Sequence, residues 1–169
     1  MSERARAGLD AAAPQAARQV LQRACGSTQW IDRMMARRPF GSHDALLEAA
    51  REEWFALDEA DWLEAFSHHP RIGDRASLEA RFPQTHDLSS KEQSGIGLAG
   101  ADVLEALAQA NHDYFDRFGF IFIVCATGKS AAEMLALLLA RLQNDRDTEL
   151  RIAAEEQSKI TARRLKSSQ

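Results

Sequence analysis

Apolar residues recur at the three- and four-residue spacing of an α-helix along most of this 169-residue chain. Ala17, Leu21 and Ala24, for example, fall on one face of a predicted helix. Residues 120–124, Phe-Ile-Phe-Ile-Val, instead have the aromatic and β-branched composition of a buried strand. Because one strand without a partner cannot form a sheet, we expect this stretch to be a buried core segment. The periodicity therefore predicts an all-α fold, a single compact multi-helix domain over residues 1–169.

Polar residues that can cap a helix precede several of the apolar runs. Their side-chain oxygens can accept a backbone N–H of the first helical turn, and the candidates are Ser27, Ser42, Asp58 and Ser130. Glu133 follows Ser130 by three residues, which is the spacing of a capping box. Gly119 is typical of a helix terminus, and we expect the last helix to begin near Thr148. These signals divide the chain into helices without an evident linker between domains.

Two adjacent histidines lie in a turn, within residues 67–74. Pro70 disfavours helical backbone at the residue before it, so we expect His69 to stand at the end of a helix. An imidazole titrates near neutrality and can pass a proton in either direction, which makes His69 the first catalytic candidate. An isolated His-His-Pro is also compatible with a solvated surface turn. The residues alone do not choose between His68 and His69.

Ser89, Glu92 and Gln93 form a second polar group. Ser89 and Glu92 have the spacing of a capping box, which by itself indicates only the start of a helix. A helix N-terminus also offers unpaired N–H donors and the positive end of the helix dipole to an anionic ligand. Gln93 adds an amide that can both donate and accept, as a ligand built from ureas and ring amides requires. Both interpretations remain open at this point.

The apolar stripe of the last predicted helix ends in a guanidinium. Steps of three and four residues place Gln157, Thr161 and Arg164 on one face, so we expect Arg164 to face inward and Arg163 outward. A charge at the edge of such a stripe is often a side chain that extends into solvent. The alternative is a clamp for a carboxylate or urea oxygen, which a guanidinium binds in bidentate geometry. Arg141 is expected to close a salt bridge.

Charge and composition argue against several classes of partner. The formal net charge is −4, with acidic and basic residues mixed along the chain, so we expect no nucleic-acid partner. No apolar run approaches the roughly 20 residues that span a bilayer, and the N-terminus lacks a secretory profile. We therefore expect no membrane partner and a cytoplasmic location. Cys25 and Cys125 indicate neither a disulfide framework nor a thiolate metal site.

Five short motifs follow one another at fitting intervals: Arg38-Pro39-Phe40, His69-Pro70-Arg71-Ile72-Gly73, Glu92-Gln93, Arg117-Phe118-Gly119-Phe120, and Lys159-Ile160 with Arg164-Leu165. From about Trp30 to Leu165 the chain therefore resembles OHCU decarboxylase, the 2-oxo-4-hydroxy-4-carboxy-5-ureidoimidazoline (OHCU) decarboxylase of urate degradation. The resemblance implies an all-α fold, usually a homodimer, that converts OHCU to (S)-allantoin and carbon dioxide. It implies that neither a metal nor an organic cofactor takes part.

The resemblance also assigns roles by motif position, and it chooses His69 over His68. The implied catalytic residues are His69 and Glu92, and the implied substrate-binding residues are Pro70, Ser89, Gln93, Phe120, Ile121 and Arg164. Phe120 and Ile121 would act through backbone groups. The implied partner is a small-molecule ureide, and we expect one cavity to be lined by His69, Glu92, Gln93 and Arg164. The transthyretin-like hydrolase fused to this enzyme in some organisms is not expected in this chain.

Two other function classes compete with this reading. The first is a metal-dependent hydrolase of a related ureide, with candidate ligands His68, His69, Asp74, His86 and His112. Their spacing matches no established metal-binding motif, and activity that survives a chelator would dismiss this class. The second is a non-catalytic helical interaction module. A set of His, Glu, Gln and Arg side chains in loops and at helix ends is unusual for such a scaffold.

Overall fold

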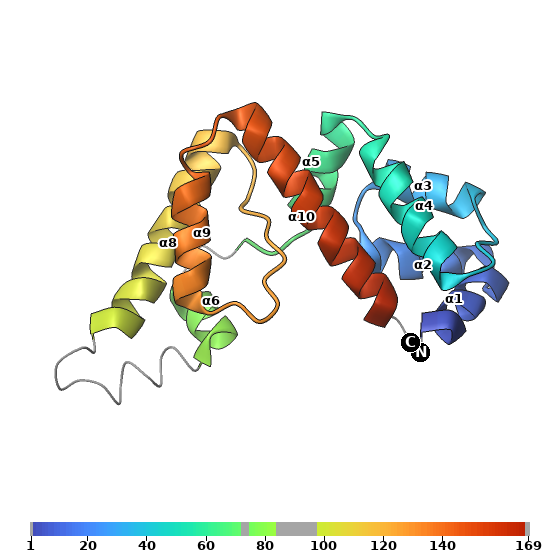
Figure 1. The fold of residues 1–169 in the computed structure, drawn as a ribbon, viewed down its shortest axis with the longest axis horizontal. Coiled ribbons are helices and arrows are strands. Elements are labelled where there is room, and N and C mark those ends of the chain that lie inside the picture. The colour runs from blue at the N-terminus through green and yellow to red at the C-terminus, as the bar shows by residue number, and fades with distance from the viewer. Residues whose placement is uncertain (1, 72–74, 84–97, 168–169) are drawn as a thin grey trace. The chain divides into compact units, whose positions relative to one another are not determined.

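The computed structural model describes residues 2–71, 75–83 and 98–167, and all regular secondary structure in these ranges is helical. This confirms the predicted all-α class. The nine helices of the described residues (Figure 1) are α1 (Ser2–Ala11), α2 (Pro14–Ala24), α3 (Thr28–Ala36), α4 (His43–Phe55), α5 (Glu59–Ser67), α6 (Arg75–Arg81), α8 (Leu98–Phe118), α9 (Ala131–Arg141) and α10 (Arg146–Ser167). None of them is long and apolar enough to cross a membrane.

The described residues form two compact units. The first unit holds those up to His69, together with Ile123–Cys125 and those from Ile152 onward. The second unit holds the described residues of Pro70–Phe122 and Ala126–Arg151. Helix α10 begins in the second unit and continues into the first. The single domain over residues 1–169 stays a prediction.

The predicted helix boundaries are confirmed at most positions. The side chains that accept an N–H of the first helical turn are Ser27, Ser42 and Asp58. Ser130 and Glu133 form both hydrogen bonds of a capping box, at 3.2 and 3.3 Å. Gly119 follows the end of α8 with φ of 79°, a left-handed conformation that favours glycine. The last helix begins at Arg146, two residues before the expected position, because the Asp145 carboxylate accepts the Thr148 N–H at 2.8 Å.

The sequence patterns did not predict α1 and α6, because both helices are polar and each buries little of its surface. Leu9 and Leu78 are their buried apolar residues. Tertiary hydrogen bonds hold α1 in place: Arg38 donates to the backbone oxygen of Asp10 at 3.0 Å, and the Asp10 carboxylate accepts the Phe40 N–H at 2.9 Å. A local sequence pattern does not reveal hydrogen bonds between residues this far apart in the chain.

Two buried tryptophans organise the first unit. Trp30 of α3 donates its indole N–H to the Ala50 backbone oxygen in α4 at 3.0 Å. Trp54 of α4 donates in the same way to Ala154 in α10 at 2.9 Å. Each indole thus buries a large apolar surface while its one polar atom stays paired. These contacts fix α3, α4 and the later part of α10 against one another.

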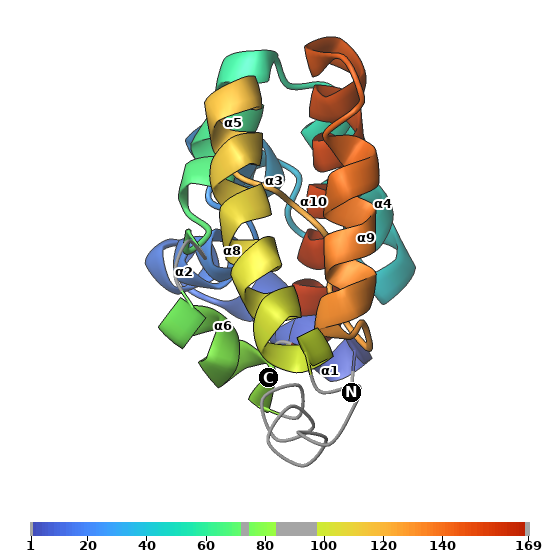
Figure 2. The same ribbon diagram turned by 90° about the vertical axis from the view of Figure 1, so that its left-hand side faces the viewer.

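In the second unit, α8 packs against α9, and both views show the two helices running in the same direction (Figures 1 and 2). Segment 119–130 must therefore lead the chain back along their length. An extended segment covers more than 3 Å per residue against about 1.5 Å in a helix, so it can do this economically. Residues 120–124 contain no strand, as expected; Phe120 and Ile123 are buried, whereas Ile121, Phe122 and Val124 are half-buried, so the expected core segment is confirmed in part.

A charged cluster is buried in the second unit, centred on the fully buried Glu149. Tyr114 donates its hydroxyl to the Glu149 carboxylate, Arg141 Nε donates to it at 2.5 Å, and Asn144 Nδ2 at 3.1 Å. Burial raises the pKa of Tyr114 far above its ordinary value, so its hydroxyl stays a donor. Arg141 thus closes the expected salt bridge. We define these four residues as the charged cluster.

Candidate active site

The sequence-predicted site residues divide between the two units. His69 and Arg164 belong to the first unit, and Pro70, Phe120 and Ile121 to the second. The other three predicted residues, Ser89, Glu92 and Gln93, lie outside the described residues. The cavity expected to unite His69, Glu92, Gln93 and Arg164 therefore stays a prediction.

His69 stands directly after α5, where Pro70 predicted that a helix would end. His68 is the C-terminal cap of this helix, and the His69 N–H still donates to the Phe66 backbone oxygen at 3.1 Å. The backbone around His69 is therefore fixed by the last turn of the helix. The His69 side chain is half-buried, so one part of the imidazole is held by the protein while another can meet solvent or a ligand.

The structure gives the two adjacent histidines different surroundings. The His68 ring lies against the backbone of Gly26, where a Cβ atom would be only 2.5 Å from His68 Cγ. A residue with a side chain at position 26 would have to displace that ring. His69 instead makes a short hydrogen bond, with 2.5 Å between its Nε2 and Gln157 Oε1. His68 is thus placed by packing and His69 by polar contact.

A buried polar chain continues from His69 into the first unit. Gln157, only 1% exposed, donates from Nε2 to Thr161 Oγ1 at 3.0 Å. The Thr161 hydroxyl in turn hydrogen-bonds the thiol of Cys25, which is completely buried. Burial raises the pKa of Cys25 to about 11, so this thiol is protonated at neutral pH. We call His69, Gln157, Thr161 and Cys25 the neutral chain.

Sequence reasoning missed this role of Gln157. It placed Gln157 on the inward face of the last helix but assigned no contact to it. The sequence feature that could have revealed this contact is a large amide on a helix face that also carries Ala153, Ala154 and Ile160. A buried amide requires hydrogen-bond partners, so its position alone called for one.

Arg164 lies at the edge of the stripe rather than within it. Both Arg163 and Arg164 are exposed, and the stripe passes instead from Thr161 to the buried Leu165. The expected inward orientation of Arg164 is therefore confirmed only in part, because residues four apart continue the buried face and leave Arg164 exposed. Arg164 Nη1 still donates to the Ala24 backbone oxygen at 3.3 Å, at the C-terminus of α2. A cation is favourable there because helix C-termini carry partial negative charge.

The three predicted residues of the second unit differ in exposure. Phe120 is buried against the rings of Tyr114 and Phe118, with centroids 5.9 and 6.0 Å apart. Its side chain is therefore committed to the core, and only its backbone groups are available to a ligand. Ile121 is half-buried and Pro70 is exposed. The backbone at Phe120 and Ile121 is not helical, so helical hydrogen bonds do not occupy its polar groups.

The metal-dependent alternative gains no ligand set from the described residues. Among them, no three His, Cys, Asp or Glu side chains are grouped so as to hold a metal ion. Two of the candidate ligands, Asp74 and His86, lie outside the described residues. His112 Nδ1 lies 3.4 Å from a guanidinium nitrogen of Arg71, so its described contact is with a cationic side chain.

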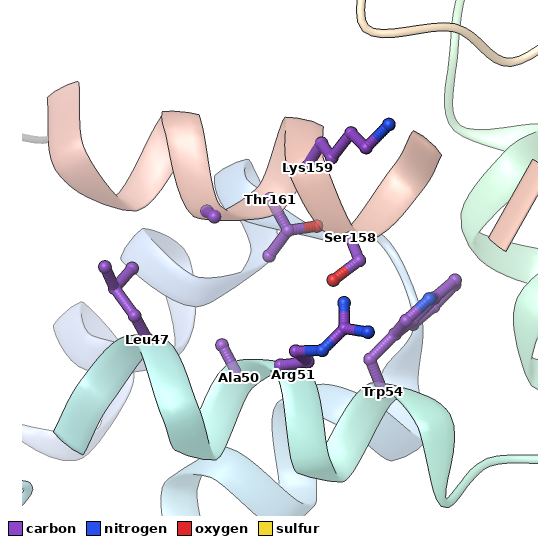
Figure 3. Close-up of a pocket in the computed structure, with 8 residues that line it drawn as sticks. Leu47, Ala50, Arg51, Trp54, Ser158, Lys159 and Thr161 are labelled. Atoms are coloured by element: carbon purple, nitrogen blue, oxygen red, sulfur yellow. The ribbon is translucent and has the colours of Figure 1, made fainter. Parts of the chain in front are cut away.

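A cavity of about 230 Å³ lies between α4 and α10 in the first unit. Figure 3 shows Arg51 and Trp54 of α4 on one side of it, and Ser158 and Thr161 of α10 on the other. Arg51 is already paired with Glu155 at 3.3 Å. None of the predicted site residues that the structure describes lines this cavity, and Thr161 is its link to the neutral chain.

A half-buried imidazole held by a buried amide in a helical protein is compatible with acid–base chemistry. Comparison with known proteins narrows this class. Residues 10–166 match the OHCU decarboxylase family, so the chain belongs to it. This confirms the resemblance drawn from the motifs.

Individual relatives agree with this assignment. The uric acid degradation bifunctional protein TTL of Arabidopsis thaliana is 40% identical over 142 residues, which are 83% of this chain and 44% of that protein. The bifunctional protein PucL of Bacillus subtilis (strain 168) is 33% identical over 141 residues, 82% of this chain and 27% of that protein. The chain thus spans less than half the length of either relative.

A solved structure shows the same architecture. The crystal structure of an OHCU decarboxylase in the presence of (S)-allantoin is 39% identical to this chain, with a TM-score of 0.66. The match covers 85% of this chain and 92% of that one. The similarity to a solved decarboxylase therefore extends over nearly the whole of that protein.

Proposed function

We propose that this chain decarboxylates OHCU to (S)-allantoin and carbon dioxide, with His69 as general acid and base. The observation that carries the proposal is the family match, which runs through residues 10–166 and includes all the predicted site residues. The half-buried His69 imidazole, ordered by Gln157, supports its assignment as the proton-transfer group.

The substrate itself supplies the electron sink. Its carboxylate is attached to a ring carbon that also bears a hydroxyl and adjoins the C=N carbon carrying the ureido group. When the bond to the carboxylate breaks, its electron pair forms a double bond to the ureido-bearing carbon. The C=N electrons move onto the ring nitrogen, which takes up a proton. The reaction therefore needs no cofactor to accept the electron pair.

Two proton movements then complete the product. The hydroxyl loses its proton and becomes the ring carbonyl, while the ureido-bearing carbon takes a proton on one face. In the proposed mechanism His69 moves a proton in these steps, and delivery to one face sets the S configuration. Holding the carboxylate out of the ring plane aligns the breaking bond with the π system.

The remaining predicted residues hold the substrate in this proposal. Glu92 orients His69 or hydrogen-bonds the ureide, while Arg164 and Gln93 bind polar edges of the substrate. The other proposed contacts are Pro70, Ser89 and the backbone groups of Phe120 and Ile121. The exposed position of Arg164 supports its proposed role in substrate binding, because its guanidinium can reach a ligand without losing all of its hydration.

We also propose that the protein is a cytoplasmic homodimer. Leu137 and Leu139 of α9 are 38% and 49% exposed, and such leucines gain from being covered by a second copy. Cys25 and Cys125 are both free thiols, as in proteins of a reducing compartment.

The test is turnover of freshly generated OHCU, followed through the circular dichroism of the chiral product. Replacing His69 by Asn should lower the enzymatic rate by about 10²–10⁴-fold, the usual contribution of a positioned acid–base group. The matched control is His68→Asn, which should keep most of the activity because that ring packs against Gly26. Near wild-type turnover by His69→Asn would overturn the role of His69, and no turnover by the wild-type chain would overturn the activity.

A further inference from the structure

The hydrogen bond to Thr161 gives the orientation of the Gln157 amide. Gln157 Nε2 donates to Thr161 Oγ1 at 3.0 Å, so the NH₂ group of this side chain faces Thr161. The NH₂ group and the oxygen of an amide lie at opposite ends of it.

This direction fixes the other end of the Gln157 side chain. With its NH₂ group on Thr161, the amide presents its oxygen to His69, at 2.5 Å from Nε2. An amide oxygen can only accept, so the His69 Nε2 must carry a hydrogen. A neutral imidazole has only one N–H, and Nδ1 is then the basic nitrogen.

Packing alone does not require glutamine at this position. Gln157 is 1% exposed on a buried face that also carries Ala153, Ala154 and Leu165, where a leucine of similar size would bury no polar atoms. The amide is compatible with burial because both of its ends are paired, one to Thr161 and one to His69. Its distinctive contribution is therefore the hydrogen bond to the imidazole.

We propose that Gln157 is a positioning residue that, held by Thr161, locks the neutral His69 ring in the Nε2–H tautomer and makes Nδ1 the proton-exchanging nitrogen. The tautomer follows from the hydrogen bonds alone, whereas its catalytic use rests on the proposed function. An amide can orient the ring without placing a formal charge beside it.

The direct test is ¹⁵N NMR of the full chain, with the His69 resonances assigned by their loss in His69→Asn. In the wild type, Nε2 should show the shift of a protonated nitrogen and Nδ1 that of an unprotonated one. Gln157→Leu keeps the volume but removes the acceptor, and should give a mixture of tautomers. Gln22→Leu, at an exposed position in α2, is the matched control and should leave the His69 spectrum unchanged. An Nδ1–H tautomer in the wild type would overturn the proposal.

Kinetics separate positioning from a merely structural role. Gln157→Leu should lower kcat by about 10- to 100-fold, less than the 10²–10⁴-fold contribution of a positioned acid–base group itself, with little change in KM. Gln157→Glu retains the acceptor but adds a charge, so it should raise the pKa of His69 and move the acidic limb of the pH–rate profile upward. An unmoved profile in a folded Gln157→Glu variant would overturn the positioning role.

Two further experiments separate the orientation of His69 by Gln157 from the catalytic role of His69. If Gln157→Leu fails to fold, Thr161→Val tests the same chain, because it removes the hydroxyl that orients the amide while keeping the side-chain shape. Loss of the single tautomer in Thr161→Val supports the proposal, and its retention overturns it. If His69→Asn keeps full activity while the wild-type ring shows only the Nε2–H form, the catalytic assignment fails but the orientation by Gln157 stands.

Discussion

The two units bury polar side chains in contrasting ways. The charged cluster of the second unit places Glu149 and Arg141 together in the interior, and each cluster member has a partner inside the cluster. The neutral chain of the first unit has no formal charge along its buried part and ends at the half-buried His69. A closed cluster can only stabilise or specify the fold, whereas a chain that ends at a half-buried imidazole can also transmit orientation to a ligand.

Electrostatics explain why the two arrangements differ. Removing two charges from water is costly, and the cost is met only when every charged atom finds a partner. The charged cluster meets this condition through the contacts that Glu149 receives from Tyr114, Arg141 and Asn144. Neutral amide, hydroxyl and thiol groups cost less to bury, so the neutral chain can run from the interior to the half-buried His69 without a buried charge. The comparison predicts that damage to the charged cluster affects stability most, and damage to the neutral chain affects the His69 environment most.

The largest expected effect is on the charged cluster. Glu149→Ala leaves Arg141 buried without its carboxylate, which should lower the free energy of unfolding by about 3–5 kcal/mol. Urea denaturation would measure this loss. Glu155→Ala is the control, because Glu155 forms an exposed pair with Arg51 at 3.3 Å and such pairs contribute about 0–1 kcal/mol. Equal losses in the two variants would contradict the distinction between buried and exposed charges.

An intermediate effect is expected where the His68 ring meets Gly26. Gly26→Ala introduces a Cβ atom 2.5 Å from His68 Cγ, and the displaced ring should cost about 1–3 kcal/mol of stability. Because His69 is the next residue, turnover should fall as well. Gly8→Ala is the matched control: nothing lies within 4 Å of its Cβ, and alanine in a helix is worth about 0.5–1 kcal/mol over glycine. Thermal unfolding of both variants should therefore show shifts of opposite sign.

The smallest expected effect is the pH dependence that Cys25 adds. Burial raises its pKa from the ordinary 9.0 to about 11, with the Arg164 charge acting in the opposite direction and Glu64 in the same one. The folded thiol keeps its proton where the unfolded one loses it, so this contribution is complete below pH 9 and declines as the pH rises toward 11. The slope should approach 1.4 kcal/mol per pH unit.

Comparison of the wild type with Cys25→Ala isolates this contribution. Urea unfolding at several pH values between 8 and 10 would be measured for both chains. Tyr114 adds a decline in the same direction as the pH approaches its ordinary pKa of 10.0, but both chains contain Tyr114, so this decline cancels in their difference. The difference between the two curves should shrink steadily above pH 9. A difference that stays constant with pH would show that the pKa of Cys25 is the same in the folded and in the unfolded protein.

Local chemistry explains how much the sequence revealed. Ser27, Ser42 and Ser130 were recognisable as helix starts because a capping oxygen and the N–H that it accepts lie within three residues of each other. Pro70 indicated the end of α5 for the same reason. The polar helices α1 and α6 carried no such pattern, since α1 depends on hydrogen bonds to residues near position 40.

The sequence by itself determined the helical class, most helix boundaries and family membership, because these depend on neighbouring residues and on short motifs in a fixed order. It also singled out His69 through the proline that follows it. Tertiary structure alone decided which group holds that imidazole, since His69 and Gln157 are 88 positions apart. It also decided that the buried face of α10 continues through Leu165 rather than Arg164. Both outcomes depend on which surfaces meet after folding, and residue spacing carries no information about a partner on another helix.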